Sequence, residues 1–293
     1  MSRIAYVNGR YLPHRQAAIH VEDRGLQFAD SVYEVCEVKD GRLVDEDRHM
    51  ARLARSLSEL RIASPRKPAA LGTILREVIR RNRVANGIVY LQVTRGVAPR
   101  GHAFPTPAVP PGLVVTARSI DPAEGAARAR AGIAVVTTPD NRWDRVDIKT
   151  VGLLPNVLAK QKAHESGAFE AWFVDENGFV TEGSSTNAWI LTSDGILVTR
   201  PAEHGILRGI TRGVVIEAAE AEGIAVEERP FSLSEALAAK EAFITASSTI
   251  VLPIVTVDGH RIGDGKAGPI ATRLRELYHR HAQYGPCRAT AVA

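Results

Sequence analysis

Two tight-turn signals decide what kind of sheet this chain can build. Asn8-Gly9 separates two short apolar runs in IAYVNGRYLP, and Asp40-Gly41 separates two more in VYEVCEVKDGRLV. Both pairs tolerate the positive φ angles of a two-residue hairpin turn, so each predicts a pair of antiparallel strands. Hairpins of this kind argue against a doubly wound parallel sheet, in which a helix follows each strand.

Helical patterns interrupt these strands. Met50, Leu53, Leu57 and Leu60 recur at helical spacing and predict a helix over about 45–62. Strands and helices are therefore mixed without regular alternation, which predicts an α+β protein. The other long helices are expected at about 69–84, 153–166, 210–223 and 269–284.

The size of the chain allows two domains. Its 293 residues are 45% hydrophobic, which is enough apolar material for one large core or two ordinary ones. A segment with little apolar content, 121–131, is expected to be a linker between the halves. The expected boundaries are a small N-terminal domain at 1–120, this linker, a larger C-terminal domain at 132–285 and a tail at 286–293.

Charge and cysteine content limit the partners. The 37 basic and 33 acidic residues are interspersed and leave a net charge of +4, so no basic patch predicts nucleic-acid binding and a small anionic ligand fits better. Cys36 and Cys287 are too few and too far apart for a disulfide framework or a metal site. No secretory signal and no apolar run of about 18 residues is present, so we expect a soluble cytoplasmic protein without a metal or membrane partner.

Lys149, in DIKTVGLLP, is the first candidate catalytic residue. A lysine between a loop and a helix is most often a solvated surface charge. Here Val151, Leu153 and Leu154 follow it, and an amine held against apolar groups has a lowered pKa and becomes a nucleophile for carbonyls. Lys149 is therefore a candidate Schiff-base lysine.

Glu182, in VTEGSSTNAW, is the second candidate. It is either a structural carboxylate satisfied by the hydroxyls of Ser184 and Ser185 and by backbone donors, or a functional acid. The functional alternative follows if Lys149 binds a Schiff-base cofactor: pyridoxal phosphate needs such an acid to keep its ring nitrogen protonated, because that positive charge draws electrons from the substrate.

Two further segments suit anionic groups. Ile210 and Thr211 begin an expected helix, where free N–H groups and the helix dipole favour phosphate, although a simple helix start is the commoner meaning. Ser247 follows a strand and can equally belong to a turn. Arg100 and His102 lie in a loop stiffened by prolines, where they are either solvated or able to hold a carboxylate.

Five blocks together resemble a known family. VEDRGLQFADSVYEV, YLQVTRGVAPRGHAFP, DIKTVGLLPNVLAKQKAHESGAFEA, VTEGSSTNAW and ILRGITRGVV occur in the order typical of fold-type IV pyridoxal-phosphate transaminases, most closely the D-amino-acid transaminases. The resemblance runs from about Tyr6 to Tyr278. It implies a two-domain fold with a small N-terminal α/β domain and a larger, cofactor-binding, mixed α/β pseudo-barrel.

The resemblance also implies residue roles and a homodimer, in which the Arg100 and His102 loop reaches the neighbouring subunit's site. Ser31, Thr186 and Ala246 depart from the family's usual residues without removing a catalytic group. The implied assignments are Lys149 as the Schiff-base lysine, Glu182 at the ring nitrogen, Arg52, Ile210, Thr211 and Ser247 around the phosphate, Leu207 against the ring, Ser185 and Thr186 near the cofactor, and Tyr33, Arg100 and His102 as the substrate carboxylate trap.

The activity so implied is a ping-pong transamination between a D-amino acid, such as D-alanine, and a 2-oxo acid. The Arg-Gly-His loop favours this activity over a branched-chain L-amino-acid transaminase, an (R)-selective amine transaminase or an aminodeoxychorismate lyase. A non-catalytic pyridoxal-phosphate-binding protein is the alternative outside catalysis.

Overall fold

The computed structural model describes residues 3–203 and 205–286. Within them the chain forms two compact units. Unit 1 takes in residues 3–121, 148–152 and 283–286, and unit 2 takes in the described residues of 122–147 and 153–282.

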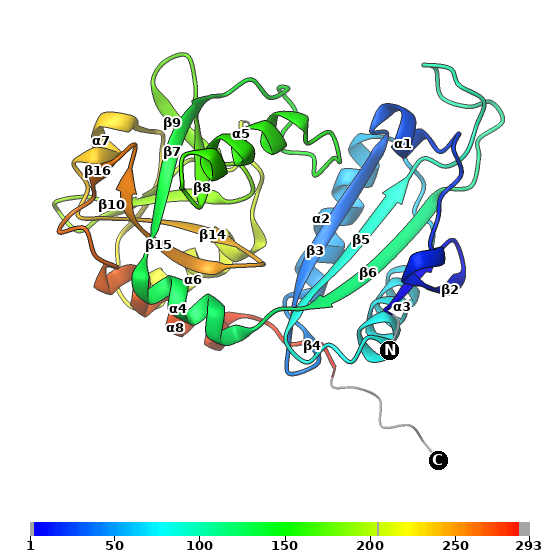
Figure 1. Cartoon of the computed structure of the whole chain (residues 1–293), viewed down its shortest axis with the longest axis horizontal. Coiled ribbons are helices and arrows are strands. Elements are labelled where there is room, and N and C mark those ends of the chain that lie inside the picture. The colour runs from blue at the N-terminus through cyan, green and yellow to red at the C-terminus, as the bar shows by residue number, and fades with distance from the viewer. Residues whose placement is uncertain (1–2, 204, 287–293) are drawn as a thin grey trace. The chain divides into compact units, whose positions relative to one another are not determined.

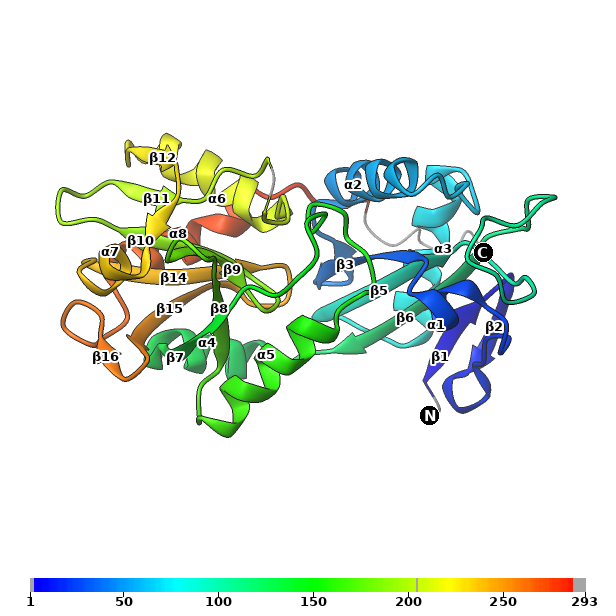
Figure 2. The same ribbon diagram turned by 90° about the horizontal axis from the view of Figure 1, so that it is seen from above.

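Unit 1 is an antiparallel sheet with helices on one face (Figures 1 and 2). Its strand order is β2-β1-β6-β5-β3-β4. The predicted hairpins are confirmed, because Val7 pairs with Arg10 and Lys39 pairs with Arg42 across two-residue turns. The elements are β1 (Ile4–Val7), β2 (Arg10–Pro13), η1 (His14–Gln16), α1 (Arg24–Phe28), β3 (Ser31–Lys39), β4 (Arg42–Leu43), α2 (Glu46–Glu59), α3 (Pro68–Arg81), β5 (Gly87–Thr94) and β6 (Gly112–Ser119).

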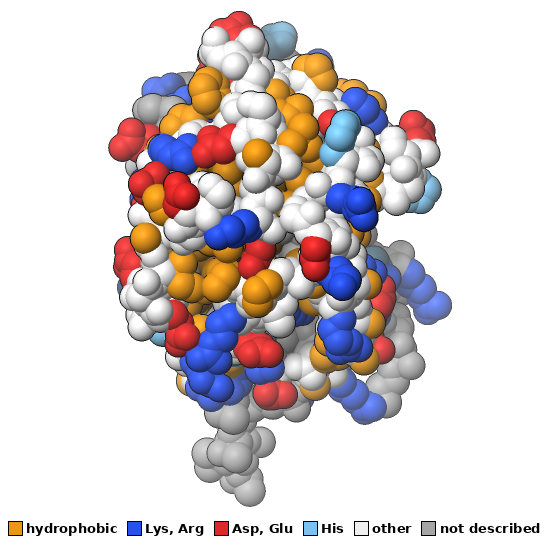
Figure 3. Space-filling view, turned by 90° about the vertical axis from the view of Figure 1, so that its left-hand side faces the viewer, with side chains coloured by type: hydrophobic (Ala, Val, Ile, Leu, Met, Phe, Trp, Pro, Cys, Tyr) orange, Lys and Arg blue, Asp and Glu red, His pale blue; other side chains and the backbone are white. Residues whose placement is uncertain are grey.

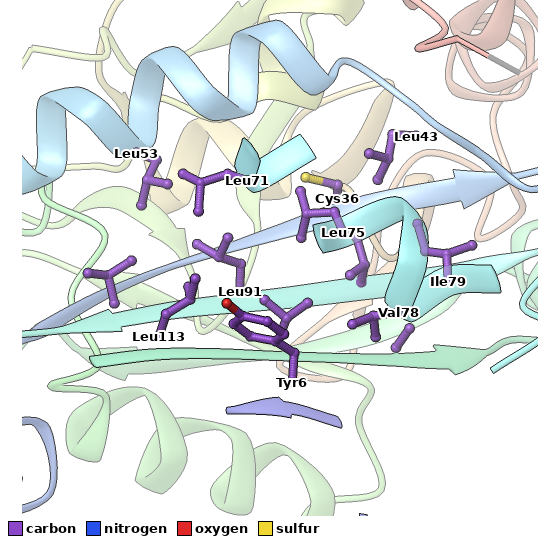
Figure 4. Packing of buried hydrophobic residues seen from close by; sticks show 14 of the residues in the cluster. Tyr6, Cys36, Leu43, Leu53, Leu71, Leu75, Val78, Ile79, Leu91 and Leu113 are labelled. Atoms are coloured by element: carbon purple, nitrogen blue, oxygen red, sulfur yellow. The ribbon is translucent and has the colours of Figure 1, made fainter. Parts of the chain in front are cut away.

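The core of unit 1 fills the space between this sheet and α2 and α3. Leu53 of α2 and Leu71 and Leu75 of α3 pack toward Leu91 of β5 (Figure 4). Alternation along β3 places Val32, Glu34, Cys36 and Val38 on the buried side and Tyr33 on the other face. Strand β3 therefore carries functional candidates on both of its faces.

Unit 2 is a mixed sheet with the order β12-β11-β10-β14-β15-β7-β8-β9-β13, and β16 pairs with β15. Helices α6 and α8 pack together next to β14 and β15, and α5 packs on β7 and β8 (Figure 2). The elements are α4 (Pro122–Ala131), β7 (Ile133–Pro139), α5 (Leu154–Glu165), β8 (Glu170–Val174), β9 (Phe179–Gly183), β10 (Asn187–Leu191), β11 (Leu197–Thr199), α6 (Ile210–Ala221), β12 (Val226–Glu228), β13 (Phe231–Ser232), α7 (Leu233–Leu237), β14 (Glu241–Ala246), β15 (Ile250–Val257), β16 (His260–Arg261) and α8 (Pro269–His281).

The structure adds two details to the expected organisation. Residues Pro122–Ala131, in the segment expected to be a linker, form helix α4. Alanine and arginine are strong helix formers, and Ala129 is the buried residue of this helix, so a helix forms with little apolar content. Residues 148–152, assigned from sequence to the C-terminal domain, belong to unit 1.

Acidic and basic side chains are interspersed on the face of the molecule shown in Figure 3. Among residues 3–203 and 205–286, no helix has both the length and the apolar character needed to cross a membrane. The same part of the chain contains no group of three or more His, Cys, Asp and Glu side chains suited to a metal ion.

Candidate functional site

Lys149 lies on a short segment that runs beside β3. The N–H of Tyr33 donates to the Lys149 carbonyl at 3.0 Å, and the N–H of Val151 donates to the Ser31 carbonyl at 3.2 Å. These bonds flank an isolated antiparallel bridge between Thr150 and Val32 and hold the lysine backbone against β3. The ring of Tyr33 lies against the lysine amine, with its centroid 4.3 Å from Nζ. Leu154, one of the apolar residues that the sequence suggested for this role, is 69% exposed.

The ring of Tyr33 is itself fixed from β5. It stacks on Tyr90 with centroids 5.6 Å apart. The Tyr90 hydroxyl donates to Gln92 Oε1 at 2.8 Å, and Gln92 Nε2 donates to Ser31 Oγ at 3.0 Å. Burial, followed by the neighbouring Tyr33, raises the pKa of Tyr90 to about 12, so this phenol stays protonated at neutral pH.

Arg52 of α2 belongs to a buried ionic cluster on the opposite face of β3. Its Nε and Nη2 each donate to a different oxygen of Glu34 at 2.8 Å, and His49 Nδ1 lies 2.7 Å from Glu34 Oε2. A bidentate pair of this kind fixes the direction of the guanidinium.

The pKa values follow from these contacts. Burial alone raises the pKa of a carboxyl, but the charge and hydrogen bonds of Arg52 and His49 lower that of Glu34 to about 2. Burial lowers the pKa of His49, although its bond to Glu34 opposes this change. Glu34 and His49 were missed from sequence, yet a glutamate among Val32, Cys36 and Val38 on one strand face was a usable signal.

Glu182 lies on β9 in unit 2, with 6% of its surface exposed. One carboxylate oxygen pairs with Arg142 Nη1, and the other accepts from Asn187 Nδ2 and from the Leu207 N–H, both at 3.1 Å. Arg142 also binds Asp140 through Nε at 2.8 Å and Nη2 at 2.7 Å. The Leu207 N–H is a backbone donor of the kind that the structural alternative assumed, whereas the donors Arg142 and Asn187 were not predicted from sequence.

The hydroxyl groups of the residues that follow Glu182 donate hydrogen bonds to a different carboxylate, that of Glu170. Ser184 donates to Glu170 Oε1, and Ser185 and Thr186 donate to Oε2 at 3.2 and 3.3 Å. Glu170 is fully buried and was not identified from sequence. A role of Ser185 and Thr186 beside a cofactor stays a prediction, since their hydroxyls serve Glu170 in this structure.

The N-terminus of α6 has the properties of an anion site. Gly209 precedes it, and a Cβ there would lie 2.0 Å from Asn187 Oδ1, so only glycine permits this close approach. Ile210 and Thr211 are its first residues, and the first N–H groups of a helix lack intrahelical acceptors. Thr211 is 2% exposed, and its hydroxyl has no hydrogen-bond partner within the described residues.

Asn187 connects this helix start with Glu182. Its Nδ2 donates both to Glu182 and to the Leu207 carbonyl, at 2.9 Å for the latter. This unpredicted amide therefore links the predicted residues Glu182 and Leu207, and its Oδ1 closely approaches Gly209, which precedes the predicted Ile210 and Thr211. Ser247 lies just after β14, the strand on which α6 packs.

Arg100 and His102 lie on an exposed loop between β5 and β6 in unit 1. The Arg100 guanidinium lies 4.7 Å from the ring centroid of Phe28, and the His102 ring lies 5.4 Å from the same centroid. The structure therefore brings these two candidates together on one aromatic ring, whereas Tyr33 contacts Tyr90 and Lys149.

The chain belongs to the class IV aminotransferases. The family model described as amino-transferase class IV matches residues 31–257. The predicted family and fold class are thereby confirmed.

Particular relatives extend the match over nearly the whole chain. A D-alanine aminotransferase of Staphylococcus haemolyticus is 38% identical over 280 residues, which cover 95% of this chain and 97% of the relative. A D-alanine aminotransferase of Bacillus licheniformis is 39% identical over 268 residues, covering 92% and 93%.

Solved structures agree with the fold. The branched-chain amino acid aminotransferase of Escherichia coli matches with a TM-score of 0.88 and 25% identity over 96% of this chain and 94% of its own. A T.th. branched-chain amino acid aminotransferase with pyridoxamine 5′-phosphate matches with a TM-score of 0.87, 29% identity and the same coverage.

Proposed function

We propose that this protein transfers an amino group between a D-amino acid, such as D-alanine, and a 2-oxo acid, with pyridoxal 5′-phosphate as its cofactor. The observation that carries the proposal is Lys149, whose backbone is fixed by β3 and whose amine lies on the ring of Tyr33. D-Alanine aminotransferases that match more than nine tenths of the chain support the same activity.

The described residues fit the cofactor. The buried Thr211 hydroxyl, which has no hydrogen-bond partner among the described residues, and the first N–H groups of α6 suit its phosphate. Arg52 supplies a guanidinium held in direction by Glu34, and we assign Arg52, Ile210, Thr211 and Ser247 to the phosphate. We assign Leu207 to the cofactor ring, with Ser185 and Thr186 near it.

When bound, pyridoxal phosphate withdraws electrons from the α-carbon of the substrate. Glu182 would hold the proton on the pyridine nitrogen, and Arg142, Asn187 and the Leu207 N–H orient its carboxylate. Lys149 would hold the cofactor through its Nζ and, once its amine is free, would take the proton from the α-carbon of the substrate.

Tyr33, Arg100 and His102 bind the α-carboxylate of the substrate in this proposal. A guanidinium binds a carboxylate through two parallel hydrogen bonds, so it selects the orientation as well as the charge. Because the lysine reaches one face of the reacting carbon, the position of the carboxylate decides which enantiomer reacts.

We further propose that the protein works as a homodimer whose Arg100 and His102 loop serves the neighbouring subunit. Helix α5 supports an interface, because Leu154, Val157 and Leu158 are 69, 58 and 59% exposed on it. An exposed apolar patch of this kind is typical of a surface that another protein covers.

Cytoplasmic localisation stays a prediction from the sequence. Cys36 is buried and free, and Cys287 lies outside the described residues.

Branched-chain L-amino-acid transamination is the second candidate, because solved branched-chain enzymes share the fold at TM-scores of 0.88 and 0.87.

The proposed function is tested by single-turnover half-reactions of the cofactor-loaded protein with D-alanine, L-leucine and an (R)-arylalkylamine. We expect D-alanine to give the largest rate constant divided by its apparent Kd. A preference for L-leucine or for the amine would replace the proposal with the corresponding activity, and no reaction with any amine would indicate a binding protein.

A further inference from the structure

Arg24, the first residue of α1, is buried, and its guanidinium binds the backbone of the loop that carries Arg100 and His102. It is 3% exposed. Its Nη1 donates to the Gly101 carbonyl at 2.6 Å and to the Ala103 carbonyl at 3.3 Å, and its Nη2 donates to the His102 carbonyl at 3.3 Å. Three consecutive carbonyls of an irregular loop therefore converge on one side chain.

A second contact network holds Arg24 itself. Its Nε donates to Asp30 Oδ2 at 2.8 Å, and Arg95 binds the same carboxylate through Nε at 2.7 Å and Nη2 at 2.9 Å. Asp30 directly precedes β3, and Arg95 directly follows β5. The guanidinium of Arg24 is thus anchored to the ends of two central strands.

Helix α1 also holds the side chains of the loop. The ring centroid of Phe28, one turn after Arg24, lies 4.7 Å from the Arg100 guanidinium and 5.4 Å from the centroid of the His102 ring. Arg24 lies 4.8 Å from the centroid of the same ring. Backbone and side chains of the loop are therefore held by two residues of one short helix.

We propose that Arg24 and Phe28 are positioning residues for the substrate carboxylate: Arg24 fixes the backbone of residues 101–103, and Phe28 fixes the side chains of Arg100 and His102. The proposal rests on the carboxylate-binding role given above to that loop. An exposed loop that must be ordered by its ligand binds more weakly, because the ordering free energy opposes binding. Arg24 removes that cost by ordering the loop beforehand.

Arginine is required for this role. A guanidinium has five N–H donors in a planar fork and can contact a carboxylate on one edge and several carbonyls on another. A lysine ammonium at position 24 keeps the charge for Asp30 but lacks the fork that reaches three carbonyls.

The test compares Arg24→Lys with Arg42→Lys in the cofactor-loaded enzyme. Arg42 is a matched control, because it also donates to main-chain carbonyls of unit 1, those of Gly285 and Tyr284, but away from the loop. We expect Arg24→Lys to raise the KM for D-alanine and the Ki for propionate by about 10- to 100-fold, on the scale of lost charged hydrogen bonds. Its kcat and cofactor Kd should change by less than about threefold, and amide exchange in residues 100–104 should accelerate.

A purely structural role would give a different result. Equal losses in KM, kcat and cofactor binding, or values that match those of Arg42→Lys, would overturn the proposal. If Arg24→Lys does not fold, Phe28→Leu carries the same comparison, with a selective rise in the propionate Ki expected and a general loss contradicting it.

The role of Arg100 is tested separately. If Arg100→Leu lowers kcat/KM for D-alanine but Arg24→Lys and Phe28→Leu leave both KM for D-alanine and the propionate Ki unchanged, the inference is wrong and the carboxylate trap stands. If Arg100→Leu changes nothing, the trap is wrong and the inference falls with it. If the trap and the positioning role are both correct, the double variant Arg24→Lys/Arg100→Leu should have a KM for D-alanine within about threefold of that of Arg100→Leu alone. The reason is that both changes remove the same interaction, the one between Arg100 and the substrate carboxylate.

Discussion

Arg52 and Glu34 form a bidentate ion pair between α2 and β3, with both N–H···O distances at 2.8 Å. The pair is nearly enclosed, since the Arg52 side chain is 9% exposed and that of Glu34 is 1% exposed. Arg52, which we assign to the cofactor phosphate, is therefore oriented by Glu34, a carboxylate that does not contact the cofactor in this assignment.

Glu34→Gln should weaken both folding and cofactor binding. Removing one partner of a buried pair leaves the other charge uncompensated and costs about 3–5 kcal/mol of unfolding free energy. Glu77→Gln is the control, because Glu77 binds Arg80 and Arg81 at the surface, where such pairs contribute about 0–1 kcal/mol. Denaturant unfolding and cofactor titration measure both effects. Equal unfolding free energies of Glu34→Gln and Glu77→Gln would contradict the predicted contribution of the buried pair to stability.

The same cluster predicts loss of stability in acid. Glu34 has its pKa lowered from 4.5 to about 2, and burial lowers that of His49 from 6.5, so the unfolded chain binds these protons more readily. Stability from His49 is complete above pH 6.5 and falls below it, and stability from Glu34 falls below pH 4.5. His49→Asn should flatten the decline in Tm between about pH 7 and 5.5, relative to the exposed control His164→Asn. An unchanged decline would show that His49 does not titrate in this way.

Turn chemistry and periodicity predicted the hairpins and the long helices because those signals are local. Partners of buried charges are not local. Glu34 lies 15 residues from His49 and 18 from Arg52, and Glu170 lies 14 to 16 residues from the three hydroxyls that it accepts. Helix α4 was missed because a sequence with one buried alanine gives no apolar stripe. The grouping of Lys149 with β3 depends on two tertiary backbone bonds that no pattern reveals.

Glu182→Gln should slow removal of the substrate α-proton. An amide cannot hold the ring nitrogen protonated as a carboxylate does, and losing one preorganised electrostatic group costs about 10²- to 10³-fold in rate. Glu170→Gln is the control, because Glu170 is also a buried carboxylate of unit 2, but it accepts from Ser184, Ser185 and Thr186 and has no assigned contact with the ring nitrogen. Stopped-flow half-reactions with D-alanine measure the rates. Unchanged rates in Glu182→Gln would assign the acid to another residue.

Arg100→Leu should separate substrates with and without a carboxylate. We expect kcat/KM for D-alanine to fall by about 30- to 1000-fold, on the scale of a lost charge-assisted pair, while an (R)-amine is little affected. The matched pair of half-reaction rates in wild type and variant gives the answer. Intact D-alanine turnover would mean that the loop does not bind the carboxylate.

The attachment of the cofactor decides the whole proposal. Borohydride reduction of the cofactor-loaded protein, followed by proteolysis and mass spectrometry, identifies the lysine that carries pyridoxal phosphate. We expect the label on the peptide that contains Lys149, and we expect Lys149→Ala to bind the cofactor without multiple turnovers. A label on Lys160 or Lys162 of α5, with Lys149 unmodified, would contradict the assignment of Lys149 and the chemistry built on it.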